Sequence, residues 1–132
     1  MKKKILIVVA NYYKDISDGL IRSAKGSLKE TFDLISVPGV FEIPIIIAKN
    51  INKYDGFIAL GGVLKGETPH FDFISKATIY GIMKLSINHK KPVGNGIITC
   101  LNKKQALARQ KKGQEAAAAL LSVLDLVKTS AD

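Results

Sequence analysis

The stretch Ile5-Leu6-Ile7-Val8-Val9-Ala10 is a continuous apolar run near the beginning of the sequence. A run without polar alternation is typical of a strand that is buried on both faces, as the strands of parallel sheets are. Met1 and the lysines at 2–4 make this region similar to a secretory signal, but the run is short and no small-residue cleavage site follows it. We therefore expect an initial strand here rather than a signal peptide.

Hydrophobic periodicity predicts further strands that alternate with helices. The expected strands cover residues 5–10, 32–37, 57–60 and 93–99. The expected helices cover about 17–30, 42–50, 70–88, 103–110 and 115–128; Ser17 or Asp18 caps the first, and the last two are separated near Gly113. Such alternation predicts an α/β fold, a three-layer α/β/α sandwich around a four-stranded parallel sheet with flavodoxin-like winding. No repeat or linker divides the sequence, so we expect a single domain over residues 1–132.

The composition excludes several classes of protein. Hydrophobic residues make up 47% of the 132 residues, too many for a disordered protein. No run of 18 apolar residues appears, so we expect no membrane span. Cys100 is the single cysteine, which excludes an internal disulfide, fits a buried small hydrophobe and suggests the reducing cytoplasm.

The net charge of +9 favours anionic partners. The lysines are nevertheless scattered along the chain, and no basic stretch is interleaved with aromatic residues. We therefore expect no nucleic-acid partner. Most lysines then form a solvated surface, and a few cations remain to hold a phosphate.

Two of the expected helices are apolar around almost their whole circumference, those at 70–88 and 115–128. A surface helix keeps a polar face, so these helices are buried inside the domain or lie at a subunit interface. One sheet of four strands cannot cover several helices all round, which favours the interface.

Polar chemistry is concentrated where two strands are expected to end, at Val37-Pro38-Gly39-Val40-Phe41-Glu42-Ile43-Pro44 and at Gly61-Gly62-Val63-Leu64-Lys65-Gly66-Glu67-Thr68-Pro69-His70-Phe71. Strand ends of a parallel sheet meet at one edge, where ligands bind. Gly61-Gly62 allows close approach of a ligand to the backbone, and Gly66-Glu67-Thr68 before a helix suits an anion. The second stretch is neither a Walker loop nor a dinucleotide fingerprint.

Individual side chains at these ends have both a structural and a functional interpretation. His70 is suited to proton transfer but is also common as a structural residue, and Glu42 can accept from hydroxyl groups or simply favour a helix start. One of Tyr12 and Tyr13 can stack on a planar ligand, and Arg109 can clamp a phosphate. No set of residues has metal-ligand spacing, so we expect no metal, and we expect no cofactor.

Taken together, these motifs resemble the lumazine synthase family. Val37–Pro44 is similar to its Val/Pro-Gly-Ala/Ser-Phe-Glu-Ile-Pro signature, and Leu60–Phe73 to its Leu-Gly-x-Val-Ile-Arg-Gly-x-Thr-x-His-Tyr/Phe-Asp segment. Pro92–Thr99 and Gln105–Arg109 are similar to its last strand and the helix after it. The resemblance runs from Ile5 to about Val127.

The resemblance implies an enzyme of riboflavin biosynthesis that joins 5-amino-6-ribitylaminouracil to 3,4-dihydroxy-2-butanone 4-phosphate and releases phosphate and water. His70 matches the proton-transfer residue. The other implied roles are these: Tyr12 stacks on the pyrimidine; Val40, Phe41 and Glu42 hold the ribityl chain and ring edge; Gly62, Val63 and Leu64 contact the pyrimidine; Glu67 and Thr68 form the phosphate-side loop; and Arg109 binds the phosphate.

The sequence departs from the family pattern at three places. Asn95 stands where many members have a Phe that closes the pocket of the neighbouring subunit. The loop before the last helix is shorter, and Lys112 is aligned with the family's lysine there. The N-terminal strand that many members have before residue 5 has no counterpart. The resemblance implies a homopentamer and leaves any larger assembly open.

Three other interpretations remain. A flavin- or nucleotide-binding module on this fold would use the same pocket without needing His70. A structural oligomer would assemble without a pocket. The archaeal riboflavin synthase shares the architecture, but the stretch Val37–Pro44 fits lumazine synthase better.

Overall fold

The computed structural model describes residues 3–29, 31–67 and 69–131, with side chains to residue 126. The elements in chain order are β1 (Ile5–Ala10), α1 (Lys14–Lys25), β2 (Phe32–Val37), the 3₁₀ turn η1 (Val40–Glu42), α2 (Ile43–Lys49), β3 (Gly56–Leu64), α3 (His70–His89), β4 (Val93–Cys100), α4 (Lys103–Ala108) and α5 (Lys112–Ala131).

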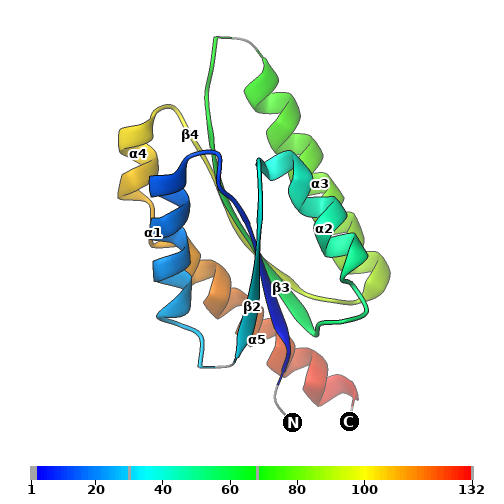
Figure 1. Ribbon diagram of the computed structural model, residues 1–132. Coiled ribbons are helices and arrows are strands. Elements are labelled where there is room, and N and C mark those ends of the chain that lie inside the picture. The colour runs from blue at the N-terminus through cyan, green and yellow to red at the C-terminus, as the bar shows by residue number, and fades with distance from the viewer. Residues whose placement is uncertain (1–2, 30, 68, 132) are drawn as a thin grey trace.

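The four strands form one sheet in the order β2-β1-β3-β4, with every neighbouring pair parallel. Helices α1, α4 and α5 lie on one face of the sheet, and α2 and α3 lie on the other (Figure 1). The expected α/β fold with its parallel sheet is therefore confirmed, and the strand order is that of a flavodoxin-like winding.

The apolar run of β1 explains the position of this strand at the centre of the sheet. Ile5, Ile7 and Val9 belong to the core beneath α1 and α5, while Leu6 and Val8 belong to the core beneath α2 and α3. All the residues of β1 are buried, as predicted for a strand covered on both faces.

Strand β3 is longer than predicted. The strand was expected to end at Leu60, before Gly61-Gly62, but residues Gly61–Leu64 continue it and pair with Ile97–Cys100. A Cβ atom at Gly61 would lie 2.8 Å from Val40 Cγ1 and 2.9 Å from Ala10 Cβ, and one at Gly62 would lie 3.1 Å from Ile16 Cγ2. These glycines therefore provide space for packing between elements rather than forming a turn.

The start of α1 was also predicted wrongly. The helix begins at Lys14 after Tyr13, so neither Ser17 nor Asp18 is its N-cap. The Ser17 hydroxyl is buried and donates to the carbonyl oxygens of Ala10 and Tyr13, the latter at 3.1 Å. It thus ties the first turn of α1 to the end of β1.

Gly113 lies inside α5 and does not separate it from α4, contrary to the prediction. A side chain at this position would clash with the Leu20 carbonyl of α1, so the glycine permits close packing of the two helices. The non-helical connection between α4 and α5 lies at residues 109–111 instead.

The two apolar helices differ in what they cover. Helix α5 buries Ala116, Ala117, Leu120 and Leu124 against the sheet and α1. Helix α3 buries only Thr78 and Ile82. Its exposed apolar side chains form a stripe made of Phe73, Tyr80, Met83 and Ile87. Burial within the domain thus accounts for much of α5, whereas the α3 stripe lacks cover from the described residues of this chain.

Candidate active site

A cleft of about 510 Å³ opens at the carboxyl ends of β1, β2 and β3. The strand order reverses between β1 and β3, and ligands of open parallel sheets bind at such a switch point. Its lining comes from three segments of the chain: Tyr12 and Tyr13; Gly39, Val40, Phe41 and Glu42; and Gly62, Val63, Leu64, Gly66, His70, Phe71 and Ile74. The cleft is within the size range of small-molecule sites.

Tyr12 presents an open aromatic face to the cleft, since its side chain is 74% exposed. Its ring meets the Tyr13 ring edge-on with the centroids 4.9 Å apart. The turn that carries both rings is held by the Asn11 N–H, which donates to the Val37 carbonyl at 2.9 Å, and by the buried Ser17 hydroxyl. A planar ligand could therefore stack on Tyr12 without moving the backbone.

The turn η1 forms a second wall of the cleft. Val40 is buried beside Gly61, while Phe41 is 59% exposed and Glu42 is half-buried. The turn is closed by the Glu42 N–H, which donates to the Gly39 carbonyl at 3.2 Å. An acceptor carboxylate and an apolar ring thus lie together at the cleft, as predicted for a segment that binds a polar heterocycle or a polyol.

His70 is the first residue of α3, is exposed, and lines the same cleft. The start of the helix is closed by the N–H groups of Asp72 and Phe73, which donate to the Pro69 carbonyl at 3.0 and 3.2 Å. An imidazole at the rim of a ligand-sized cleft can exchange protons with a bound molecule.

The loop before α3 contributes Gly66 to the lining of the cleft. Glu67 is exposed and does not line the cleft, and Thr68 lies outside the described residues.

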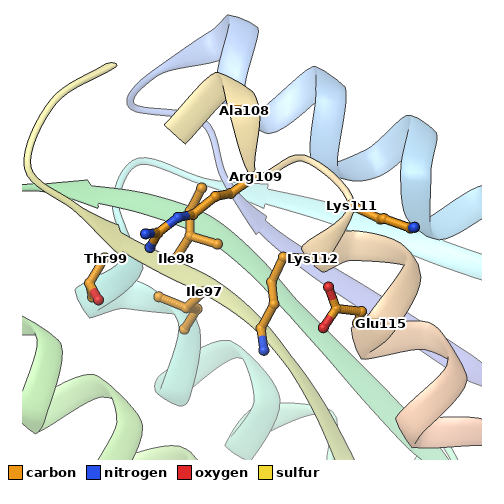
Figure 2. Close-up of a pocket in the computed structure, with 8 residues that line it drawn as sticks. All are labelled: Ile97, Ile98, Thr99, Ala108, Arg109, Lys111, Lys112 and Glu115. Carbon is orange, nitrogen blue, oxygen red and sulfur yellow. The ribbon is translucent and has the colours of Figure 1, made fainter. Parts of the chain in front are cut away.

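A separate basic pocket of about 450 Å³ lies over β4, where α4 ends and α5 begins (Figure 2). It is lined by Ile97, Ile98, Thr99, Ala108, Arg109, Lys111, Lys112 and Glu115. The Arg109 side chain crosses β4, with its Nη1 atom 4.0 Å from Cys100 Sγ, and Lys112 lies at the start of α5 (Figure 2). Three cations against one carboxylate suit an anion such as a phosphate.

Sequence reasoning missed most of the residues of the basic pocket, although it singled out Arg109 and Lys112. Thr99 is exposed at the carboxyl end of β4. That position, on a strand expected to end at the ligand-binding edge, is the signal that could have identified it.

The cleft and the basic pocket share no residues. Gly62 and Val63 line the cleft, and their partners on β4, Ile98 and Thr99, line the basic pocket. The structure therefore brings together Tyr12, Val40, Phe41, Glu42, Gly62, Val63, Leu64 and His70 at the cleft, but not Glu67. It places Arg109 and Lys112 together in the basic pocket and does not unite the two groups within one chain.

Asn95 lies apart from both. It is exposed on β4, an edge strand of the sheet, and its Oδ1 accepts from the Ile97 N–H at 3.0 Å. It lines a small hollow with Met83 and Ser86 of α3.

The described residues contain no group of three or more histidine, cysteine or acidic side chains that could hold a metal ion. Within the same ranges no helix is both long enough and apolar enough to cross a membrane. Among the described residues, two side chains with shifted pKa values lie outside the cleft and the basic pocket. A hydrogen bond from Lys103 lowers the pKa of Asp15, and a hydrogen bond to Asp33 raises the pKa of Tyr54.

Comparison with known proteins gives a consistent result. A family model described as 6,7-dimethyl-8-ribityllumazine synthase matches residues 2–128. A protein of that name from Agrobacterium fabrum is 42% identical over 142 aligned positions, which cover 96% of each chain. The protein of the same name from Bartonella tribocorum is 40% identical, and the alignment covers 100% of this chain and 96% of that protein. A 6,7-dimethyl-8-ribityllumazine synthase 1 from Rhodopseudomonas palustris is 43% identical and covers 92% of this chain and 83% of its own.

Proposed function

This chain belongs to the 6,7-dimethyl-8-ribityllumazine synthase family, and from that premise we propose that the cleft and the basic pocket are the two halves of its active site. The chain is an enzyme of riboflavin biosynthesis of the transferase class. Its reaction condenses 5-amino-6-ribitylaminouracil with 3,4-dihydroxy-2-butanone 4-phosphate and releases phosphate and water. Each pocket suits one of these two substrates.

The cleft binds the pyrimidine substrate. Its planar ring stacks on the exposed face of Tyr12 and contacts the backbone of Gly62, Val63 and Leu64. Val40, Phe41 and Glu42 hold the ribityl chain, and the Glu42 carboxylate accepts from its hydroxyl groups. The volume and the mixture of apolar walls with few polar groups support this assignment.

His70 transfers protons. Imine formation followed by loss of phosphate requires a proton to leave carbon and others to move between nitrogen and oxygen, and an imidazole serves both directions near neutral pH. The position of His70 on the rim of the cleft that holds Tyr12 and Glu42 is the single observation that carries the proposal.

Arg109 and Lys112 bind the phosphate of the butanone, and the family resemblance assigns Glu67 and Thr68 to phosphate binding as well. A guanidinium can grip two phosphate oxygens at once, and a nearby ammonium adds charge as the phosphate departs. Because Arg109 and His70 line different pockets of one chain, we assign them to a site shared between neighbouring subunits. Asn95, exposed on the edge strand β4, also reaches the neighbour's cleft in this arrangement.

The partner subunits are copies of this chain in a homopentamer. The exposed stripe of α3 and the open edge of β4 support association. We place the enzyme in the cytoplasm because Cys100 is a buried free thiol, as is usual in a reducing compartment.

The direct test is to mix the purified protein with both substrates and follow the absorbance of the lumazine product, beside a His70→Ala variant. Product formation well above the uncatalysed rate, slowed in the variant, is the expected result. Absence of product from folded, assembled protein would overturn the assignment of the reaction.

A second test addresses the shared site. His70→Ala and Arg109→Ala subunits are unfolded, mixed in equal amounts and refolded together. In a ring of randomly mixed subunits, roughly a quarter of the interfaces pair an intact His70 with an intact Arg109, so about that fraction of activity should return. If mixing restores nothing, although each variant assembles alone, the site lies within a single subunit.

A further inference from the structure

Residues 110–114, which comprise the end of the α4–α5 connection and the first residues of α5, pack on one face of α1 through three contacts. The Gln110 side chain lies over Gly19, Gly113 packs against the Leu20 carbonyl, and the Gln114 N–H donates to Ser23 Oγ at 2.8 Å. Residues 19, 20 and 23 are neighbours on one face of a helix, so α1 supplies a continuous seat.

The hydrogen bond to Ser23 completes the start of α5. The first four N–H groups of a helix have no partner within the helix. Here the N–H groups of Lys112, Gly113 and Glu115 donate to the carbonyl groups of Arg109, Gln110 and Lys111 at 3.0 to 3.1 Å, so all three acceptors lie in the connection that directly precedes α5. Gln114 is the exception, because its acceptor is the Ser23 hydroxyl of another helix, 91 positions earlier in the sequence. Ser23 therefore acts as a cap that α5 does not supply for itself.

Gly19 and Gly113 allow α1 and residues 110–114 to pack closely against each other. A Cβ atom at Gly113 would lie 3.0 Å from the Leu20 carbonyl carbon and 3.2 Å from the Ala24 nitrogen, both backbone atoms that cannot move aside alone. At Gly19 an added Cβ would overlap the Gln110 side chain. Larger residues at either position would lift the connection away from α1.

The cations of the basic pocket are chain neighbours of these anchors: Arg109 directly precedes Gln110, and Lys111 and Lys112 lie between Gln110 and Gly113. Gln110, Gly113 and Gln114 contact α1. Arg109, Lys111 and Lys112 line the pocket (Figure 2). Anchors and cations thus alternate within one short segment, so the contacts with α1 determine where the cations lie.

We propose that Ser23 is a positioning residue for phosphate binding, which acts on Lys112 and Arg109 by capping α5 from α1. The inference rests on the proposed role of the basic pocket. Without the Ser23 hydroxyl, the first turn of α5 loses its only tertiary hydrogen bond among the described contacts. The side chains of Lys112 and Arg109 are then held less firmly and sample more positions.

The test is a Ser23→Ala variant of the assembled enzyme, with Ser23→Thr to restore the hydroxyl and Ser122→Ala as a control for an exposed serine of α5. Steady-state rates give KM for each substrate, calorimetry gives the affinity for inorganic phosphate, and thermal unfolding reports stability. We expect Ser23→Ala to raise KM for the butanone phosphate and to weaken phosphate binding by about threefold to tenfold, the effect of losing one cap. KM for the pyrimidine and kcat stay unchanged, Ser23→Thr recovers most of the loss, and Ser122→Ala behaves as the wild type.

A Lys112→Gln variant separates this inference from the function on which it rests. If Lys112→Gln weakens phosphate binding and Ser23→Ala does not, the positioning role of Ser23 is refuted and the phosphate site stands. If Lys112→Gln also leaves phosphate binding unchanged, the basic pocket is not the phosphate site and both proposals fail. Equal loss of affinity for both substrates in Ser23→Ala would assign it a merely structural role.

Discussion

Replacing Gly61 with alanine should impair binding of the pyrimidine substrate through a small movement of one wall of the cleft. Gly61 is buried on β3 beneath Val40, the first residue of η1. The added methyl group would lie 2.8 Å from Val40 Cγ1 and 2.9 Å from Ala10 Cβ. Carbon atoms in contact are separated by about 3.5–4.0 Å, so one partner has to retreat by roughly 0.7–1 Å.

Ala10 belongs to the interior strand β1 and is paired with Val37 of β2, whereas η1 is a single short turn. We therefore expect η1 to move and to carry Phe41 and Glu42 with it. A displacement near 1 Å of groups that position a substrate lowers kcat/KM by up to about a hundredfold. Overpacking of about 1–3 kcal/mol, partly offset by the lower chain entropy of alanine, lowers Tm by about 3–8 °C.

The assay is steady-state kinetics with each substrate varied in turn, together with thermal unfolding. Gly66→Ala is the matched control, because Gly66 lines the same cleft, no glycine among the described residues has a positive φ, and nothing lies within 4 Å of a Cβ atom added there. The expected result is at least a tenfold rise in KM for the pyrimidine, with KM for the butanone phosphate unchanged. A Gly61→Ala enzyme with a lower Tm but an unaltered pyrimidine KM would refute the reasoning that η1 sets the binding geometry.

Three other changes test other parts of the molecule. His70→Ala should lower kcat by about a hundredfold without abolishing turnover, because the site still holds the two substrates together. The rate is measured as lumazine absorbance. Loss of all activity would mean that His70 does more than move protons. Arg109→Lys keeps the charge but loses the two-point grip, so KM for the butanone phosphate should rise about tenfold while that for the pyrimidine stays the same. The Tyr54 hydroxyl donates to Asp33 at 2.6 Å, which raises the pKa of Tyr54, so this bond stabilises the fold below about pH 10 and its contribution is lost as pH rises through the raised pKa. Tyr54→Phe should therefore unfold at lower urea than the wild type at neutral pH, with the difference disappearing in strong alkali; a constant difference would contradict the assignment.

The interior strand β1 was predictable because its burial is visible in the local sequence. An unbroken apolar run such as Ile5–Ala10 is typical of a strand that is covered on both faces. The ends of elements depended on distant partners. Gly61 and Gly113 suggested local breaks, but each serves close packing against another element, Val40 in one case and Leu20 in the other. No window of sequence around these glycines contains that information.

The candidate site divides in the same way. Tyr12, Glu42 and His70 follow strands that meet at one edge, so the rule for parallel sheets places them together. Arg109 and Lys112 follow the fourth strand and face a different pocket, which this rule does not separate from the first. In the proposed shared site, their relation to His70 would depend on contacts between subunits, which no single sequence motif encodes.

The packing of α5 also has a consequence for the order in which the protein is made. Leu120 and Leu124 cover the sheet face that carries Ile58 and Leu60. The cations of the basic pocket take their place only when residues 109–114 pack against α1. Every residue described for the cleft has been translated by then. On the ribosome the cleft can therefore take shape first, and the basic pocket is completed only as translation passes into α5.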